Sequence, residues 1–512
     1  MSGSETGIEL EAAVAESHIS TVFFTPDRAY KILKPLKTSF LDHSTSGQRL
    51  RSIDDELALN RRMAPDVYLG TADVVERGAV VDRMLVMRRM PADRRLSELV
   101  ASGADVASCL RAIARQVAVF HQAQEPADDG HELGGRDAVR ANWAGNFGDL
   151  QSVRGTLISD EAYDRVAYLS DRYLEYRGPL FEARLAIGAV RDGHGDLTAQ
   201  DIFCLDDGPR ILDCLAFDRR LRVADVLADI AFLAMDLERL SPDELESSSA
   251  LAGSSLTSDF LHWYQEFSNE HHPPSLADHY VAYRAHVRAK VGTIRHRQGD
   301  PTAGPKVRTY HDLCLRHLER GRVRMFIIGG GPGTGKTTMA RTMADSYQAM
   351  NLSTDEVRKD LTGRSHLDRE FTPVGEGIYS ADMTDRTYDH LLERASKVLD
   401  GGRSVVLDGS WSLARHRADA LTLARVKGAD AIEIECVLDA ETAEARIVER
   451  LAEGQDPSDA RPELLDELRR RREPWPSAVN IDSSGSFGDA HSRALAIVAD
   501  LDGAAQGSEV QI

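Results

Sequence analysis

The chain has few cysteines, and none of them is arranged as a metal or redox motif. Its 512 residues include five cysteines, at 109, 204, 214, 314 and 436, and no two form a C-x-x-C pair. Zinc knuckles and thiol redox motifs use such pairs, and a disulfide framework normally needs an even number. We therefore expect no disulfide framework and no zinc site, and a reducing cytoplasm is the natural compartment.

Long apolar runs are also missing, and we expect no leader sequence. No apolar run approaches the roughly 20 residues that a transmembrane helix requires. The first 17 residues, MSGSETGIELEAAVAES, are acidic and lack the basic start and apolar centre of a signal peptide. We expect a cytoplasmic protein with no membrane partner.

Positive charge is scarce as well. The chain carries 62 Lys and Arg against 82 Asp and Glu, a net charge of -20. A nucleic-acid-binding protein normally presents a broad basic face, so we expect no nucleic acid partner. Overall acidity is still compatible with polyanionic ligands that a few local cations bind. The length predicts two or three domains.

The most specific motif is a phosphate-binding loop. Residues 330–337 read GGPGTGKT, after the apolar run 325–328 and before the helix-compatible segment 338–344. Glycines let successive backbone N–H groups point at one phosphate chain, and the following helix adds its positive end. Lys336 can reach the β- and γ-phosphates, and the Thr337 hydroxyl can ligate Mg²⁺. The predicted nucleotide-binding residues are Gly330, Gly331, Pro332, Gly333, Thr334, Gly335, Lys336, Thr337 and Thr338.

In the rest of the chain, the hydrophobic pattern predicts strands and a helix near the N-terminus and mostly helices after them. A polar Gly/Pro-bearing stretch, 295–305, is either a linker or an exposed loop between helices. The other predicted elements are strands at 21–24, 29–33, 80–81 and 84–87, a helix at 47–63, helices from 96 onward broken at 190–218, helices again at 223–294, and a helix at 308–321.

Residues 191–218 carry a second chemical signal. His194-Gly195-Asp196-Leu197, then Asp201, then Ile211-Leu212-Asp213, resembles the catalytic and metal-binding segments of aminoglycoside-phosphotransferase-like kinases. The resemblance implies that Asp196 is the base that accepts the proton of the attacking hydroxyl. It also implies that Asp201 and Asp213 are the Mg²⁺ ligands.

Other motifs of the same kinase family have counterparts in the first half of the chain, in the same order. Lys31, in AYKIL, is similar to the lysine that pairs with the α/β-phosphates, and Glu56 stands where its partner glutamate is expected. Asp229 matches an acidic position that is usually structural. Three departures leave open a domain that binds a ligand without efficient phosphoryl transfer. No Gly-rich loop precedes Lys31, Asp201 stands where the family has Asn, and Thr198 follows Leu197 where relatives often have His.

The second half resembles small P-loop kinases of the gluconate-kinase and zeta-toxin-like group. Ser353-Thr354-Asp355, with Arg358, matches their S-x-D-x-x-R element, which implies that Asp355 orients or deprotonates the acceptor hydroxyl. The alternative is a helix N-cap at Ser353 or Thr354. Asp408 ends the apolar strand 404–407 and is either a Mg²⁺-shell carboxylate or part of an Asp-Gly turn.

A lid over the nucleotide is the last predicted feature. Arg446 and Arg450 are one helical turn apart, so they share a face and are better lid candidates than the basic run 469–472, which more often forms a solvated face. We include Arg446 and Arg450 among the predicted nucleotide-binding residues.

These observations predict a two-domain fold. An α+β protein-kinase-like, aminoglycoside-phosphotransferase-like bilobal domain (1–294) is followed by a linker and connecting helix (295–322). An α/β P-loop kinase domain with a parallel sheet (323–505) completes the chain. Nearly the whole length resembles bacterial bifunctional phosphotransferase/ATP-binding proteins.

The resemblance implies ATP and Mg²⁺ as cofactors and a small-molecule hydroxyl as acceptor. The alternative function is a nucleotide-dependent regulatory protein, in which the first domain senses a ligand and the P-loop domain is the one ATP site. A toxin-like kinase of a cell-wall sugar nucleotide is a narrower third possibility. The sequence does not indicate the oligomeric state.

Overall fold

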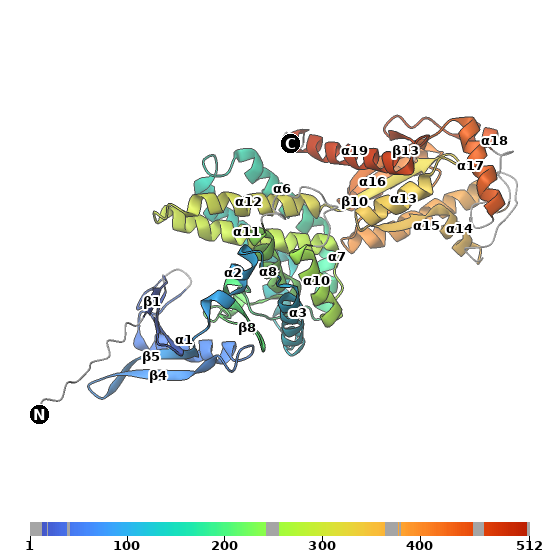
Figure 1. Cartoon of the computed structure of the whole chain (residues 1–512). Helices are drawn as coiled ribbons and strands as arrows, with labels where there is room; N and C mark the ends of the chain where they lie inside the picture. Colours follow the sequence, from blue (N-terminus) through green and yellow to red (C-terminus); the bar gives the residue numbers. More distant parts are fainter. Residues whose placement is uncertain are drawn as a thin grey trace, which may run out of the picture. The chain divides into compact units, whose positions relative to one another are not determined.

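The computed structural model describes residues 13–17, 19–37, 41–241, 255–363, 377, 380–453 and 465–508 (Figure 1). The chain divides into two compact units. The first comprises residues 1–141, 184–248 and 252–271, and the second comprises 142–183, 249–251 and 272–512. Helices from the first half of the chain therefore group with the C-terminal half. The domain boundaries predicted at residues 294 and 323 do not coincide with the boundaries of these units. That the predicted domains fold independently stays a prediction.

The first unit begins with a five-stranded antiparallel sheet of order β1-β2-β3-β5-β4, covered by helix α1. Leu33, Ile53 and Leu85 form the core between helix and sheet. The predicted strands at 80–81 and 84–87 are one strand, β5. Strand β4 was not predicted because its inward-facing positions include Gly70 and Ala72, which give little apolar alternation. The elements are β1 (Ala13–Glu16), β2 (Ser20–Phe24), β3 (Arg28–Leu33), α1 (Ser46–Asn60), β4 (Tyr68–Glu76) and β5 (Ala79–Arg88).

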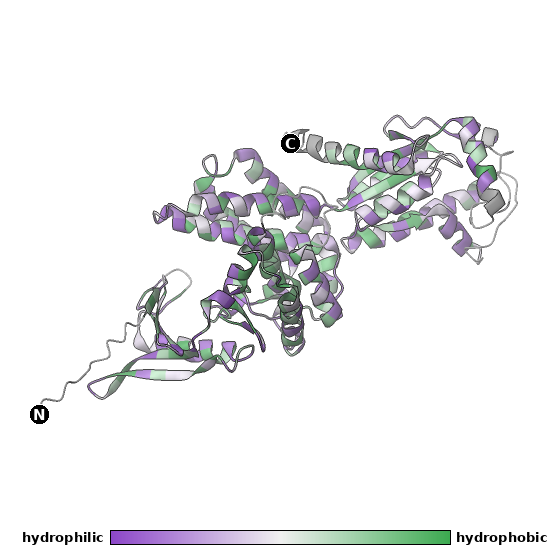
Figure 2. Cartoon of the chain, in the orientation of Figure 1, coloured by the Kyte–Doolittle hydropathy of each residue, from purple (hydrophilic) through white to green (hydrophobic). Residues whose placement is uncertain are grey.

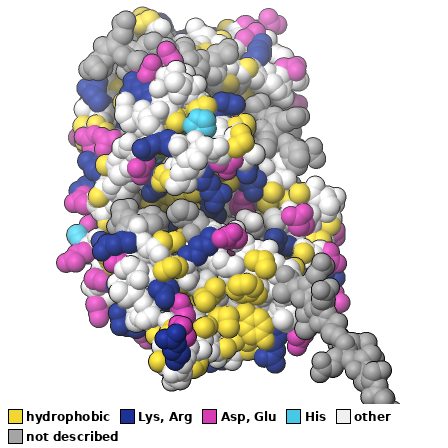
Figure 3. All heavy atoms as spheres, turned by 90° about the vertical axis from the view of Figure 1, so that its left-hand side faces the viewer, with side chains coloured by type: hydrophobic (Ala, Val, Ile, Leu, Met, Phe, Trp, Pro, Cys, Tyr) yellow, Lys and Arg dark blue, Asp and Glu magenta, His cyan; other side chains and the backbone are white. Residues whose placement is uncertain are grey.

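The opposite face of this sheet is apolar and partly exposed. Val14, Phe23 and Tyr30 lie opposite one another on neighbouring strands, and Val14 and Phe23 are 56% and 38% exposed. The side of the molecule that faces the viewer in Figure 3 carries a cluster of hydrophobic side chains with Lys and Arg beside it. The sheet therefore uses only one of its two apolar faces for the core.

Helices and two small antiparallel ladders make up the rest of the first unit. The ladders, β6 with β9 and β7 with β8, hold the segment 190–225, where the sequence predicted a break between helices. Helix α8 is buried from Val226 to Glu238, and Figure 2 shows it as largely hydrophobic. The elements are α2 (Leu96–Ala101), α3 (Ala107–Gln122), α4 (Gly130–Gly134), β6 (Val190–Asp192), β7 (Ile202–Leu205), β8 (Gly208–Ile211), β9 (Val223–Asp225), α8 (Val226–Leu240) and α10 (Leu256–Ser268).

One cysteine pairing departs from the sequence-based expectation. Cys109 of α3 and Cys204 of β7 form a disulfide, although they are 95 residues apart in sequence. Such a pairing arises from the tertiary fold and leaves no trace in cysteine spacing. Cys214, Cys314 and Cys436 are free and buried.

The second unit opens with a layer of helices. The polar stretch 295–305 contains the turn between α11 and α12, and Gly292 of α11 lies against Val307 of α12, so the two helices form an antiparallel pair. Of the two alternatives for this stretch, the loop between helices is the one observed, and the predicted helix at 308–321 begins earlier, at Ala303. The helices are α6 (Asp160–Tyr176), α11 (Pro274–Arg297) and α12 (Ala303–Arg320), while α5 (Arg136–Leu150) and α7 (Gly178–Ala186) cross the boundary between the units.

A parallel five-stranded sheet of order β11-β12-β10-β13-β14 forms the remainder of the second unit. Alternate residues of the central strand β10 face opposite layers: Phe326 and Ile328 pack against α13 and α19, and Met325 and Ile327 pack against α14, α15 and α16. The elements are β10 (Arg324–Gly330), α13 (Lys336–Ser346), β11 (Met350–Ser353), α14 (Thr354–Leu361), α15 (Ala381–Asp400), β12 (Val405–Asp408), α16 (Ala414–Val426), β13 (Asp430–Val437), α17 (Ala440–Glu453), α18 (Leu465–Arg471), β14 (Val479–Asp482) and α19 (Phe487–Ser508). None of the helices in the described part of the chain has the length and apolarity needed to span a bilayer.

Candidate active sites

The phosphate-loop sequence forms a tight turn between β10 and α13. Gly333 and Gly335 have φ angles of 77° and 81°, which glycine adopts at little cost. A Cβ atom on Gly333 would lie 2.5 Å from the carbonyl oxygen of Ala443, so no larger residue fits there. Helix α13 begins at Lys336, so its N-terminal N–H groups face the loop. The backbone has the form that the motif requires.

Asp408 and Thr337 meet at the edge of the sheet beside this loop. Strand β12 runs parallel to β10 with Asp408 opposite Ile328, and the Thr337 hydroxyl donates a hydrogen bond to the Asp408 carboxylate. Burial raises the pKa of Asp408, while the charge of Lys336 and the Thr337 hydrogen bond oppose this rise. Within the described residues, Oδ1 of Asp408 is buried with no hydrogen-bond partner. A buried, unsatisfied carboxylate oxygen beside a hydroxyl fits a Mg²⁺ ion.

Asp355 lies at the start of α14, where the N-cap interpretation is confirmed and the catalytic role stays a prediction. The Ser353 hydroxyl accepts the N–H of Asp355 at 3.2 Å, so Ser353 is the N-cap. The Asp355 side chain is 50% exposed and accepts a hydrogen bond from Nη1 of Arg358 at 3.0 Å. Capping therefore leaves the Asp355 carboxylate available, with the nearly buried Arg358 fixing its orientation.

Arg446 of α17 is linked to the phosphate loop through a residue that the sequence did not reveal. Its Nη2 donates to the carbonyl of Ser483 at 2.7 Å, and the Ser483 hydroxyl donates to the carbonyl of Thr334 at 2.8 Å. Ser483 follows β14, far along the chain, and a serine after a strand carries no recognisable signal. Arg450 also lies in α17, but its side chain is outside the described residues, as are residues 454–464.

In the first unit, three predicted residues come together from distant segments. Nζ of Lys31 on β3 lies 2.6 Å from Oε1 of Glu56 on α1 and 3.4 Å from Oδ1 of Asp213. Burial lowers the pKa of Lys31, but the charges of Asp213 and Glu56 outweigh burial and raise it overall. The charge of Lys31 lowers the pKa of Asp213, whereas burial raises that of Glu56. Lys31 stays a cation, as phosphate binding requires.

A buried carboxylate fixes the loop that carries Asp196. The backbone N–H groups of His194 and Gly195 donate to Asp229 at 2.6 and 2.8 Å, and Nε2 of His121 lies 3.0 Å from the same carboxylate. Burial would raise the pKa of Asp229, but these hydrogen bonds and the nearby histidines lower it overall. Asp196 itself is half-buried, next to this anchored turn. Asp229 thus holds the loop in place.

The second predicted metal ligand, Asp201, lies at the end of the same loop. The Thr198 hydroxyl donates to Oδ2 of Asp201 at 2.8 Å, and the N–H of Leu212 donates to the Asp201 carbonyl at 3.0 Å. This backbone contact ties the segment of Asp201 to the segment that ends in Asp213. Two carboxylates on adjoining segments suit Mg²⁺ chemically.

The turn between β1 and β2 differs from a phosphate-covering loop in its hydrogen bonding. The N–H groups of Ile19 and Ser20 donate to the Ser17 hydroxyl at 3.3 and 2.9 Å. In a Gly-rich loop such groups point at phosphates. Here a side chain of the turn itself occupies them.

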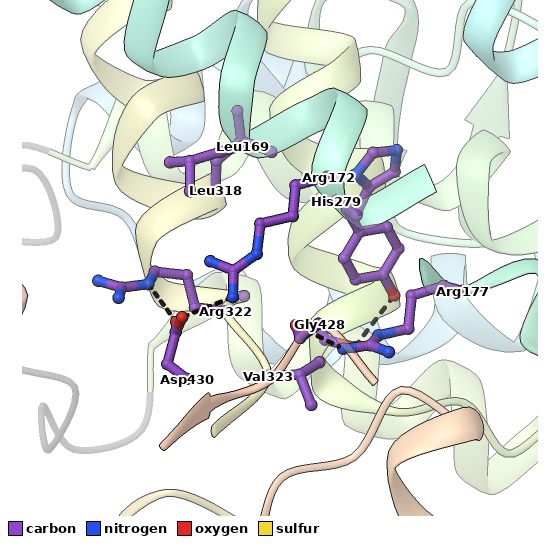
Figure 4. A pocket seen from close by; sticks show the side chains of 12 residues that line it. Leu169, Arg172, Arg177, His279, Leu318, Arg322, Val323, Gly428 and Asp430 are labelled. Carbon is purple, nitrogen blue, oxygen red and sulfur yellow. Dashed lines mark hydrogen bonds and ion pairs between the residues drawn. The ribbon is translucent and has the colours of Figure 1, made fainter. Parts of the chain in front are cut away.

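A cavity in the second unit carries no sign of a catalytic role. Its volume is about 30 Å³, enough for a water molecule but too small for a nucleotide or a sugar. Figure 4 shows Arg172 and Arg322 pointing at Asp430, and each lies 2.7 Å from it. Nearby, Arg177 donates to the carbonyls of Lys427 and Gly428, at the C-terminal end of α16. These contacts join the helical layer to the parallel-sheet layer.

The fold defines the class of protein: an α+β unit with an aminoglycoside-phosphotransferase-like fold, followed by an α/β P-loop domain with a parallel sheet. Residues 325–475 match the family AAA_33, described as an AAA domain. Over 476 residues, 92% of each chain, the sequence is 36% identical to Uncharacterized protein Rv2004c of Mycobacterium tuberculosis and to Uncharacterized protein Mb2027c of Mycobacterium bovis. The chain belongs to the family of these mycobacterial proteins.

Solved structures show more distant similarity. A choline/ethanolamine kinase family protein from Mesorhizobium loti is 12% identical, with a TM-score of 0.36 over 61% of this chain and 92% of its own. The GDP and kanamycin complex of APH(2")-IIia gives 13% identity and a TM-score of 0.37, over 60% of this chain and 92% of its own. A gluconokinase from Sinorhizobium meliloti 1021 is 15% identical, with a TM-score of 0.28 over 36% of this chain and 97% of its own.

Proposed function

We propose that the protein is an ATP-dependent phosphotransferase with two nucleotide-binding domains, which transfers the γ-phosphoryl group to a hydroxyl of a small molecule. The observation that carries this proposal is that each compact unit has its own lysine beside its own carboxylates. Lys31 lies beside Glu56 and Asp213, and the loop of Lys336 lies beside Asp408. A cytoplasmic location, and the absence of a nucleic acid partner, stay predictions.

In the P-loop domain, the loop N–H groups and Lys336 would bind the phosphates, and Thr337 and Asp408 would hold Mg²⁺. The bound metal would neutralise the charge that develops on the transferring phosphoryl group. Asp355 would accept the proton of the acceptor hydroxyl, and its ion pair with Arg358 would hold the carboxylate in place. Arg446 would approach the phosphates from the side of Ser483.

In the first domain, Lys31 would bind phosphate oxygens with Glu56 holding its ammonium group. Asp201 and Asp213 would hold Mg²⁺, and Asp196 would accept the acceptor proton. The turn that Asp229 anchors fixes the backbone next to Asp196, so the carboxylate is positioned before the substrate binds.

The acceptor can be sought by mass spectrometry of a metabolite mixture incubated with ATP and the full chain. The proposal expects a compound that gains one phosphate. It expects the Asp196→Asn variant or the Asp355→Asn variant to lose that product while ATP affinity stays near wild type, because each change removes a proton acceptor and keeps the side-chain shape. A product formed equally by both variants would contradict the assigned bases.

One observation favours the regulatory alternative for the first domain. The Ser17 hydroxyl occupies the N–H groups of Ile19 and Ser20, so these two groups are less available to phosphates than those of a Gly-rich loop. In that case the first domain would sense a ligand, and the P-loop domain would be the one ATP site. Single-turnover ATP consumption by the Lys336→Ala variant, with and without the acceptor mixture, separates the two functions: consumption by the first domain supports catalysis there.

A further inference from the structure

The backbone at Asp213 has a conformation that needs support from its surroundings. Its φ angle is 63°, in the left-handed region that few residues other than glycine adopt. Such a conformation persists where neighbouring groups hold it, and it occurs often at functional sites. Asp213 is also the residue whose carboxylate lies 3.4 Å from Lys31.

Two buried side chains hold this backbone by hydrogen bonds. The N–H of Asp213 donates to the Tyr68 hydroxyl at 2.9 Å, and the N–H of Cys214 donates to Oδ1 of Asn60 at 2.8 Å. Nδ2 of Asn60 in turn donates to the carbonyl of Glu56 at 2.9 Å. Asn60 is thus joined both to the segment of Asp213 and to the helical turn that carries Glu56.

Packing alone does not account for the identities of these residues. Tyr68 and Asn60 are 2% and 1% exposed, and Tyr68 belongs to the apolar cluster of Leu33, Ile53 and Leu85. A buried polar group destabilises a core unless it is hydrogen-bonded, and Phe or Leu would fill similar space without that cost. The partners that satisfy the polar groups here belong to the segment of the predicted metal ligand.

We propose that Asn60 and Tyr68 are positioning residues that hold Asp213 in its left-handed conformation, with its carboxylate toward Lys31 and the metal. Through Asn60, the end of α1 and the Asp213 segment keep a fixed relation, so Glu56, Lys31 and Asp213 are aligned before nucleotide binds. This inference rests on the proposed binding of Mg·ATP by the first domain, and it adds residues that touch neither nucleotide nor metal.

The test uses the full chain with Lys336→Ala, so that nucleotide binding reports the first domain. ATP affinity is measured by calorimetry across a series of Mg²⁺ concentrations and without Mg²⁺. Tyr68→Phe removes one oxygen atom, and Asn60→Leu removes the second acceptor. Each is expected to weaken Mg²⁺-dependent ATP affinity about fivefold, the size of one lost hydrogen bond, and to leave metal-free binding unchanged. A merely structural role would not separate the two conditions.

Two further variants serve as controls: one removes a tyrosine hydroxyl elsewhere, and the other removes the predicted metal ligand. Tyr163→Phe also removes the hydroxyl of a buried tyrosine, which donates to the carbonyl of Phe147, and it is expected to bind as the parent does. Asp213→Ala is expected to lose the Mg²⁺ dependence. If Asp213→Ala binds as the parent does, the proposed function of this site is wrong. If Asp213→Ala weakens binding but Tyr68→Phe matches Tyr163→Phe, the positioning role is wrong. Tyr68→Phe decides alone if Asn60→Leu does not fold.

Discussion

Nζ of Lys31 lies 2.6 Å from Oε1 of Glu56, and both side chains are largely withdrawn from solvent. Glu56→Gln keeps the shape and removes the charge, so Lys31 retains Asp213 as its carboxylate partner. We expect the free energy of unfolding to fall by about 2 kcal/mol, less than when a buried charge loses every partner. Chemical denaturation measures this. Equal stability of wild type and Glu56→Gln would show that the pair does not contribute to the fold.

The second prediction is about how much the Asp229 carboxylate, which anchors the loop of Asp196, contributes to stability. Asp229→Asn replaces an acceptor of several hydrogen bonds by an amide and should lower stability by about 2–4 kcal/mol. The folded-state pKa of Asp229 is lowered, so its contribution is complete above its ordinary pKa and is lost as the pH falls below it. Denaturation of wild type and variant from pH 7 down to pH 3 measures both effects.

The exposed Asp137 provides the control for this experiment. Its side chain is 79% exposed, so Asp137→Asn should change stability little. If Asp229→Asn were no less stable than Asp137→Asn, the carboxylate would not anchor the loop.

Buried histidines in the second unit predict acid sensitivity. Burial lowers the pKa of His279 to about 3, and Nε2 of His279 accepts the indole N–H of Trp143 at 3.3 Å, which requires a neutral ring. Because the folded state favours the neutral form, the stabilisation is present above the unfolded pKa of about 6.5 and is lost as the pH falls toward 3. Trp143 fluorescence should report this loss. His279→Gln should reduce the pH dependence, and an unchanged profile would exclude His279 as its source.

Arg177 supports a prediction about the contact between the helical layer and the parallel-sheet layer. Its guanidinium donates to the carbonyls of Lys427 and Gly428 at 2.7 and 3.2 Å, where a cation also complements the helix dipole. We expect Arg177→Ala to lower stability by about 3 kcal/mol, because two half-buried carbonyls lose their charged donor. Arg469→Ala, at an exposed position of α18, is the control and should change stability little. Equal losses in both variants would argue against a capping role.

The phosphate loop was predictable because its signal is local. A strand, a glycine-rich turn and a helix follow one another within residues 324–346, and the glycine positions are required by φ angles and close contacts. The proximity of Lys31 and Asp213 was predictable for another reason. The two residues are 182 positions apart in sequence, and the order of the family motifs indicated a pairing that no local pattern contains.

Features that depend on tertiary contact were missed. The pairing of Cys109 with Cys204, the link of Arg446 to Ser483 and the support of Asp213 by Tyr68 each join distant segments through one side chain. The stretch 295–305 has the composition of a linker, but α11 and α12 pack against each other on either side of it. Composition alone does not distinguish a turn between packed helices from a linker between domains.

The central claim is that each half of the chain binds its own Mg·ATP, and the number of nucleotides bound per chain tests it most directly. Calorimetry on the full chain should give two nucleotides for wild type and one for either Lys336→Ala or Lys31→Ala, because each change removes one phosphate-directed ammonium group. A single nucleotide in wild type that Lys336→Ala abolishes would contradict the claim. The first domain would then be a module that binds a ligand for the P-loop kinase.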